Sequence, residues 1–291
     1  EQCAAHMADG FSRASGRTGV CLATSGPGAT NLVTGVATAY ADSVPMMVLT
    51  GQVASSVLGM GAFQEVDAFS LMMPVTKYNY RVLELNQLPK AMDEGWKLAV
   101  AGRPGPVHID LPVDSINSDI DEGLLTCNFS IPKQSYDLSN IPAATELIRN
   151  AKSPVILAGG GVISSDTSED VVRFAEMIGA PIITPMMGLG CIPYDHPLSL
   201  GPLGMHGKMA ALDAIKSADL LIVMGARFSD RTYSKRTSIN PACKVIHIDI
   251  DRTEFDKRLP ATLNIHADLR DAIGEMTRHL GPFAPKEDWA I

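Results

Sequence analysis

The fold is decided by Val155-Ile156-Leu157-Ala158, an unbroken apolar run that leads directly into Gly159-Gly160-Gly161. A strand with apolar residues at consecutive positions is covered on both faces, as in a parallel sheet flanked by helices. Glycines directly after such a strand let the chain turn into a helix and approach a bound anion closely. This stretch therefore predicts one βα unit of an α/β fold.

Short apolar runs alternate with helical patterns along the rest of the chain. Further strands are predicted at Val20–Ala23, Met46–Thr50, Val107–Leu111, Ile182–Thr184, Leu220–Met224 and Val245–Asp249. Helices are predicted at about 29–41, after Thr167-Ser168-Glu169-Asp170, and from about 268 to 280, before Gly281-Pro282. Between them, residues 113–142 are rich in Asp, Ser, Asn and Pro, which is typical of a linker between two domains.

Composition narrows the classes of function. A chain of 291 residues with 46% hydrophobic and 19% charged residues is typical of two globular domains. The net charge of −8 disfavours a nucleic-acid partner. Because no apolar run approaches the roughly 20 residues that span a bilayer, we expect no membrane partner and a cytoplasmic location. The five cysteines have no metal-ligand spacing, so we expect reduced, mostly buried thiols and no metal ligands in this chain.

The first domain contains several motifs that can carry chemistry. Glu1 stands at the start of a helical pattern, where a carboxylate is usually only a surface residue that complements the helix dipole. A glycine-rich turn follows at Thr24-Ser25-Gly26-Pro27-Gly28-Ala29-Thr30-Asn31. Further along lie Gly51-Gln52-Val53, Ala62-Phe63-Gln64-Glu65, Val75-Thr76-Lys77 and Gly102-Arg103-Pro104-Gly105-Pro106-Val107.

In this order and spacing, the motifs resemble the pyrimidine-binding domain of acetolactate synthase large (catalytic) subunits, which are thiamine-diphosphate-dependent transferases. The resemblance implies that Glu1, Pro27 and Asn31 contact the cofactor. A carboxylate at Glu1 would favour the aminopyrimidine tautomer whose exocyclic nitrogen removes the thiazolium proton. It also implies that Phe63 and Gln64 line the substrate channel. His6 and His108 match no ligand spacing, and we expect structural roles for them.

The second domain extends the resemblance with glycine-rich pieces beside strand ends, where open α/β sheets bind nucleotides. In the family these pieces hold FAD, assisted by the arginine that matches Arg103. The resemblance implies a flavin site made of Gly159, Gly160, Gly161, Leu203, Gly204, Met205, His206, Gly207, Gly225, Arg227, Arg231, Asp249, Ile250, Asp268 and Leu269. The fold alone leaves open another nucleotide, or none.

Several positions depart from the family pattern. The chain has Ala54 where a Pro is usual, Gly59-Met60-Gly61 where Gly-Thr-Asp is usual, and Val113 where a Lys is frequent. No Gly-Asp-Gly motif with a later Asn is present, so we expect the ligands of Mg²⁺ and of the cofactor diphosphate in a domain that this chain lacks.

The predicted fold class is α/β, with two doubly wound parallel-sheet domains, the second Rossmann-like. The expected organisation is an N-terminally truncated pyrimidine-binding domain at 1–118, a linker at 119–142, a central FAD-binding-type domain at 143–282, and the start of another linker at 283–291.

The expected activity is acetolactate synthesis from pyruvate and a second 2-oxo acid, in branched-chain amino acid biosynthesis. The expected assembly is a homodimer or higher homo-oligomer with a possible regulatory small subunit. Oxalyl-CoA decarboxylase, sulfoacetaldehyde acetyltransferase and a non-catalytic nucleotide-binding or assembly fragment are the alternatives.

Overall fold

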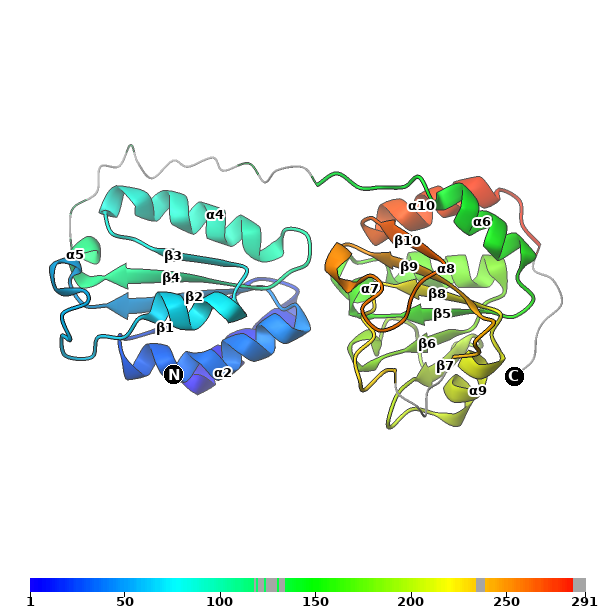
Figure 1. Ribbon diagram of the computed structural model, residues 1–291, viewed down its shortest axis with the longest axis horizontal. Helices are drawn as coiled ribbons and strands as arrows, with labels where there is room; N and C mark the ends of the chain where they lie inside the picture. The colour runs from blue at the N-terminus through cyan, green and yellow to red at the C-terminus, as the bar shows by residue number, and fades with distance from the viewer. Residues whose placement is uncertain (118, 120–122, 124–129, 131–133, 234–238, 285–291) are drawn as a thin grey trace. The chain divides into compact units, whose positions relative to one another are not determined.

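The computed structural model shows two compact units, Glu1–Gln134 and Ser135–Ile291, which are described separately below (Figure 1). It describes residues 1–117, 119, 123, 130, 134–233 and 239–284. Each unit contains one sheet, and every strand pair in both sheets is parallel. The predicted α/β class is thus confirmed. Half of the expected linker at 119–142 and most of the expected tail at 283–291 lie outside the described residues, and the domain bounds stay predictions.

The first unit has a four-stranded sheet in the order β1-β2-β4-β3. Helices α1 and α2 pack on one face of this sheet and α4 on the other (Figure 1). The elements are α1 (Gln2–Ser15), β1 (Gly19–Ala23), α2 (Pro27–Asp42), β2 (Met46–Gln52), α3 (Ala68–Met72), β3 (Tyr78–Arg81), α4 (Leu88–Val100), β4 (Pro106–Pro112) and α5 (Val113–Ile116). Short 3₁₀ turns lie at Ser55–Val57, Met73–Val75 and Leu85–Gln87.

The strand period of two divides the apolar residues of β2 between two cores. Met46 and Val48 join the cluster under α1 and α2, whereas Met47, between them, joins the cluster under α4. All three side chains are fully buried. Successive side chains point to opposite faces of a strand, so an unbroken apolar run is what a strand between two helix layers requires.

The second unit has a six-stranded sheet in the order β10-β9-β8-β5-β6-β7. Strand order reverses between β5 and β8, the arrangement of doubly wound sheets that bind dinucleotides at the reversal. The elements are α6 (Ile141–Asn150), β5 (Pro154–Ala158), α7 (Gly160–Ser164), α8 (Ser168–Ile178), β6 (Ile182–Thr184), β7 (Ser199–Pro202), α9 (Met209–Ser217), β8 (Leu220–Met224), β9 (Lys244–Asp249), β10 (Leu263–His266) and α10 (Leu269–Leu280), with 3₁₀ turns at Met186–Gly188 and Arg252–Glu254.

Alternation along β5 divides the second unit in the same way. Ile156 and Ala158 belong to the core that includes residues of α6, α8 and α10, and Val155 and Leu157 belong to the core that includes residues of α9. Besides Val155–Ala158, the sequence predicts six strands from apolar runs. All six appear in the structure, and most of them are one or two residues longer than predicted. Helix α8 begins where the sequence predicts it, but Thr167 makes no side-chain cap, and its Oγ1 instead donates to Val162 O at 3.3 Å.

Candidate functional site

Glu1 lies at the N-cap of α1, where its carboxylate is exposed and reaches the first turns of α2. Asn31 Nδ2 donates to Glu1 Oε2 at 3.2 Å. The two helices come this close because small residues face each other: a Cβ built on Gly35 of α2 would lie 2.5 Å from Ala5 Cβ of α1. The sequence therefore brings Glu1 and Asn31 together through helix packing, and the contact leaves the carboxylate at the surface.

The turn before α2 meets the loop that carries Gln64. Gly26 has φ 59° and ψ −117°, a conformation open essentially to glycine. A Cβ on Gly26 would lie 2.6 Å from Gln64 O, so the absence of a side chain permits the contact. Gln64 itself has φ 59°, which is uncommon for a residue with a Cβ. Pro27, which follows Gly26, is the first residue of α2, and its fixed φ suits that position.

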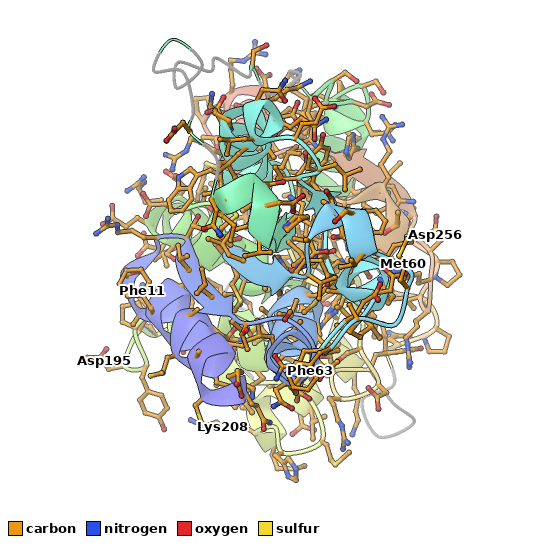
Figure 2. The ribbon with its side chains drawn as sticks, turned by 90° about the vertical axis from the view of Figure 1, so that its left-hand side faces the viewer. Phe11, Met60, Phe63, Asp195, Lys208 and Asp256 are labelled. Atoms are coloured by element: carbon orange, nitrogen blue, oxygen red, sulfur yellow. The ribbon has the colours of Figure 1, made fainter. Side chains whose placement is uncertain are left out.

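Phe63 and Met60 stand on the surface of the same loop, labelled in Figure 2. Their exposed fractions are 90% and 75%, far above the usual range for such apolar side chains. The first unit thus groups four of its predicted site residues around the start of α2: Glu1 and Asn31 through a hydrogen bond, and Pro27 and Gln64 through the turn.

Arg103 precedes β4 and therefore lies at the end of the sheet where its parallel strands begin, whereas α2 starts at the end where they finish. Its Nε donates to Oγ of Ser43, the residue that follows α2, at 2.7 Å. Nearby, Lys77 Nζ donates to the carbonyls of Leu98 and Ala101, both at 2.6 Å, and so satisfies the C-terminal end of α4. Burial, with the Arg103 cation, lowers the pKa of Lys77 to about 8. The first unit therefore does not bring Arg103 to the group around Glu1.

In the second unit, Gly159 and Gly161 pack against Gly225 at the reversal of strand order. A Cβ on Gly159 would lie 2.2 Å from Gly225 O, and one on Gly161 would lie 2.7 Å from Gly225 Cα. The Gly159 amide donates to Met224 O and the Gly161 amide to Gly225 O, both at 2.9 Å. These two amides, which the sequence suggested as phosphate ligands, are engaged by the protein itself. The glycines let two backbones touch.

The loops after β7 and β8 are joined through Arg231. Met205 N donates to Arg231 O at 3.1 Å, and Arg231 Nη1 lies 3.5 Å from Met205 Sδ. Gly204, at φ 129°, would place a Cβ 2.5 Å from Arg231 O. The amides of Gly204 and His206 donate to no other residue that the structure describes. The Arg231 side chain is 72% exposed, and its Nε lies 3.9 Å from Oδ2 of the similarly exposed Asp230.

The ends of β9 and β10 supply the remaining predicted residues. Asp249 Oδ1 accepts from Asp251 N at 2.8 Å, and Asp268 Oδ1 caps α10 by accepting from Arg270 N at 2.9 Å. Ile250 O lies 3.0 Å from His266 Nε2. Every glycine-rich or acidic piece predicted for the flavin in this unit lies at or just after the C-terminal end of a parallel strand. All of them therefore lie at the same end of the sheet. The same holds for Gly160, Gly207, Arg227 and Leu269.

A buried polar cluster in the first unit was not anticipated. Asp110 on β4 is fully buried, and its Oδ1 accepts from Thr50 Oγ1 at 2.7 Å. Its Oδ2 accepts from Arg81 Nε at 2.8 Å and from Gln52 Nε2 at 3.2 Å. His108 Nε2 lies 2.8 Å from Thr50 Oγ1. The signal was present in the sequence, since Thr50 and Gln52, like His108 and Asp110, interrupt apolar strands at a spacing of two.

Comparison with known proteins identifies the family. Residues 1–71 match "Thiamine pyrophosphate enzyme, N-terminal TPP binding domain", and residues 141–276 match "Thiamine pyrophosphate enzyme, central domain". The chain belongs to the thiamine pyrophosphate enzymes. The two matches follow the two units, which confirms the predicted relationship.

Relatives within this family include acetolactate synthase large subunits. The chain is 48% identical over 282 residues to the "Probable acetolactate synthase large subunit" of Methanocaldococcus jannaschii, covering 95% of this chain and 48% of the relative. It is 44% identical over 279 residues to the "Acetolactate synthase large subunit" of Corynebacterium glutamicum, covering 95% and 45%. The chain spans about half the length of the curated relatives it matches.

The described residues contain neither a membrane-spanning helix nor a cluster of metal ligands. No helix among the described residues is both long and apolar enough to cross a bilayer. Within the same part of the chain, no three His, Cys, Asp or Glu side chains are grouped as metal ligands. Of the five cysteines, Cys127 lies outside the described residues, and Cys3, Cys21, Cys191 and Cys243 are free thiols.

Proposed function

We propose that this chain forms part of an acetolactate synthase, which decarboxylates pyruvate and joins the two-carbon unit to a second 2-oxo acid. The contact between Glu1 and Asn31, beside the Gly26 turn, carries the proposal together with the similarity to the family over nearly the whole chain. It leaves an exposed carboxylate, oriented by Asn31, beside the first turns of α2.

Glu1 would hold the aminopyrimidine ring of thiamine diphosphate. The carboxylate fits this role because one oxygen is oriented by Asn31 while the group remains exposed. When bound, the cofactor supplies the carbon nucleophile that pyruvate decarboxylation requires. Glu1 would hold a proton at a ring nitrogen, and Gln64 and Phe63 would line the path by which substrate arrives.

FAD is the proposed ligand of the second unit. Arg231 offers a charge, and Gly204 and His206 offer amide donors at one sheet edge, where a diphosphate can be bound. Two buried polar atoms at the C-terminal ends of strands at this edge, Thr184 Oγ1 and His266 Nδ1, have no partner among the described residues. A long ligand with several hydrogen-bonding groups would satisfy such atoms.

The remaining proposals follow from the relatives. The relatives are named large subunits, which implies a regulatory small subunit as a partner. The proposed two-carbon transfer implies pyruvate and a second 2-oxo acid as substrates. We propose a homodimer or higher homo-oligomer in the cytoplasm, with Mg²⁺ and the cofactor diphosphate held by residues outside this chain.

Calorimetric titration of the chain with FAD, NAD and coenzyme A tests the flavin proposal. We expect FAD to bind most tightly, and Arg231→Ala to weaken it about ten- to hundredfold by removing a charge-assisted bond. His279→Ala is the control, because His279 lies at the far end of α10. A preference for coenzyme A would move the chain to the oxalyl-CoA decarboxylase branch.

A chimera tests the activity itself. The chain replaces the matching 282 residues of the Methanocaldococcus jannaschii relative, and acetolactate formation from pyruvate is measured. We expect activity, and a fall of about 10²–10⁴-fold with Glu1→Gln, the usual contribution of acid–base catalysis. Glu146→Gln, in the exposed face of α6, is the control. Near-normal turnover of a folded Glu1→Gln chimera would refute the role of Glu1.

A further inference from the structure

The loop that carries Phe63 and Gln64 is anchored to the interior of the first unit at the residues that follow it. Gln52 Nε2, which donates to the buried Asp110, also donates to Val66 O at 2.8 Å. Arg81 reaches the same carboxylate with Nε and extends Nη2 to Asp67 Oδ1 at 2.8 Å. Gln52 and Arg81 therefore link two consecutive loop residues, Val66 and Asp67, to the Asp110 carboxylate.

The upstream half of the loop is closed on itself by Glu65. Its carboxylate accepts the amides of Gly59 and of Ala62, the latter at 2.9 Å, and Glu65 N donates to Ala62 O at 2.9 Å. These backbone donors hold the pKa of Glu65 below its usual range. Within the Glu65 closure, just before the anchor at Val66 and Asp67, the chain takes the positive φ of Gln64 and exposes Phe63 to solvent.

The shape of this loop needs external support. A positive φ at a residue with a Cβ costs free energy and persists only where the surroundings determine it. An apolar ring that is 90% exposed gains nothing from burial in its own unit, so Phe63 does not supply that support. The Asp110 carboxylate does, because a buried charge keeps its hydrogen-bond partners firmly placed.

We propose that Arg81 and Asp110 are positioning residues, which hold the loop of residues 59–67 in the conformation that presents Phe63 and Gln64 to substrate. The presentation to substrate rests on the proposed function, whereas the anchoring of the loop does not. Arg81 is suited to the role because its side chain links a fully buried carboxylate to Asp67 at the surface, and its guanidinium also lies 5.8 Å from the centroid of the Phe69 ring.

Hydrogen exchange of the 291-residue chain, followed by mass spectrometry, tests the anchoring without any ligand or activity. We expect Arg81→Met to raise exchange at the amides of residues 59–67 about ten- to hundredfold, the effect of losing a hydrogen bond to a charged group. Arg81→Lys, which keeps the charge and one donor towards Asp110, should restore part of the protection. Exchange of the β1 and β2 amides should stay unchanged.

Arg13→Met is the matched control, because Arg13 also bridges two aspartates of the first unit, Asp9 and Asp42, both at 2.9 Å. It should leave residues 59–67 protected. If Arg81→Met unfolds the unit, Asp67→Asn decides, since it weakens only the outer tie and retains a residue that can cap α3. Unchanged loop exchange in a folded Arg81→Met protein, an equal rise with Arg13→Met, or no rise with Asp67→Asn where Arg81→Met unfolds would each overturn the proposal.

The functional half of the proposal is tested separately in the active chimera. Arg81→Met should lower kcat/KM for pyruvate, and Arg81→Lys should partly recover it. A looser loop with unchanged kcat/KM would refute the presentation of Phe63 and Gln64 to substrate and leave the anchoring intact. An inactive parent chimera would count against the proposed function alone, because the exchange result stands on its own.

Discussion

Lowering the pH from 7 to 5 should destabilise the first unit through His108. This histidine on β4 is fully buried, with Nε2 2.8 Å from Thr50 Oγ1 and Nδ1 2.6 Å from Asn79 Oδ1. Burial lowers its pKa to about 4, while the Asp110 carboxylate acts to raise it and the Arg81 guanidinium to lower it further. Burial therefore favours neutral His108 in the native protein well into the acid range.

The direction follows from proton binding to the two states. A histidine in the unfolded chain has a pKa of about 6.5, so the unfolded state binds a proton there below that pH. Native His108 binds one only near pH 4, so the unfolded state is favoured between these two values. The contribution of neutral, buried His108 to the free energy of unfolding is complete above about pH 6.5 and is lost as the pH falls towards 4. The difference between the two pKa values corresponds to about 3 kcal/mol, of which about 2 kcal/mol is lost by pH 5.

Urea denaturation at pH 7, 6 and 5 measures this loss. Trp96 on α4 reports the first unit when Trp289, which lies outside the described residues, is replaced by Phe. We expect the free energy of unfolding of the parent to fall about 2 kcal/mol more than that of His108→Gln between pH 7 and 5. His6→Gln, which removes an exposed histidine of α1, is the control for the loss of a histidine as such. Parallel curves for the parent and His108→Gln would refute the reasoning.

Two other predictions use paired residues of the first unit. Gly26→Ala should cost at least about 2 kcal/mol of unfolding free energy, because of its backbone conformation and its contact with Gln64 O, whereas Gly10→Ala, in an open helical position, should gain about 0.5–1 kcal/mol. Equal losses in the same urea assay would contradict this account. Burial raises the pKa of Cys21 to about 11, so iodoacetamide at pH 8 should modify it about a hundredfold more slowly than the exposed Cys3. Peptide mass spectrometry measures both rates, and similar rates would show that Cys21 is accessible.

Most of the strands that the sequence predicts lie inside a sheet, and β1 (Gly19–Ala23), at a sheet edge, is the exception. Leu220–Met224 is found with the same bounds as predicted, and all five of its side chains are buried. By contrast, β3 at Tyr78–Arg81 was not anticipated: it lies at the sheet edge, its four residues are only half buried, and it mixes aromatic with polar side chains. An apolar run is expected of a strand buried on both faces, and β3 lacks one. The run alone does not show such burial, because β1 is predicted from its apolar run although it is an edge strand with Val20 and Leu22 exposed.

The Asp110 cluster could not be assembled from the sequence for a different reason. Thr50 and Asp110 are opposite each other in the register of β2 and β4, yet 60 residues separate them in the chain. Predicting that both strands exist does not give their order in the sheet, and here β4 lies between β2 and β3. A polar residue at the end of an apolar strand therefore indicates a buried partner without indicating which one.

The glycine-rich motifs predicted the place of the second site better than its chemistry. Gly159, Gly161 and Gly225 were taken as positions where backbone approaches a ligand, but their contacts show that they first let β5 and β8 approach each other. Such glycines are expected wherever strand order reverses, whatever binds there. The identity of the ligand must then depend on groups that hold no strand in place, such as the Gly204 amide and the exposed Arg231 guanidinium. For this reason Arg231→Ala is a more discriminating test of the flavin than any glycine substitution, which would disturb the sheet before it disturbed a ligand.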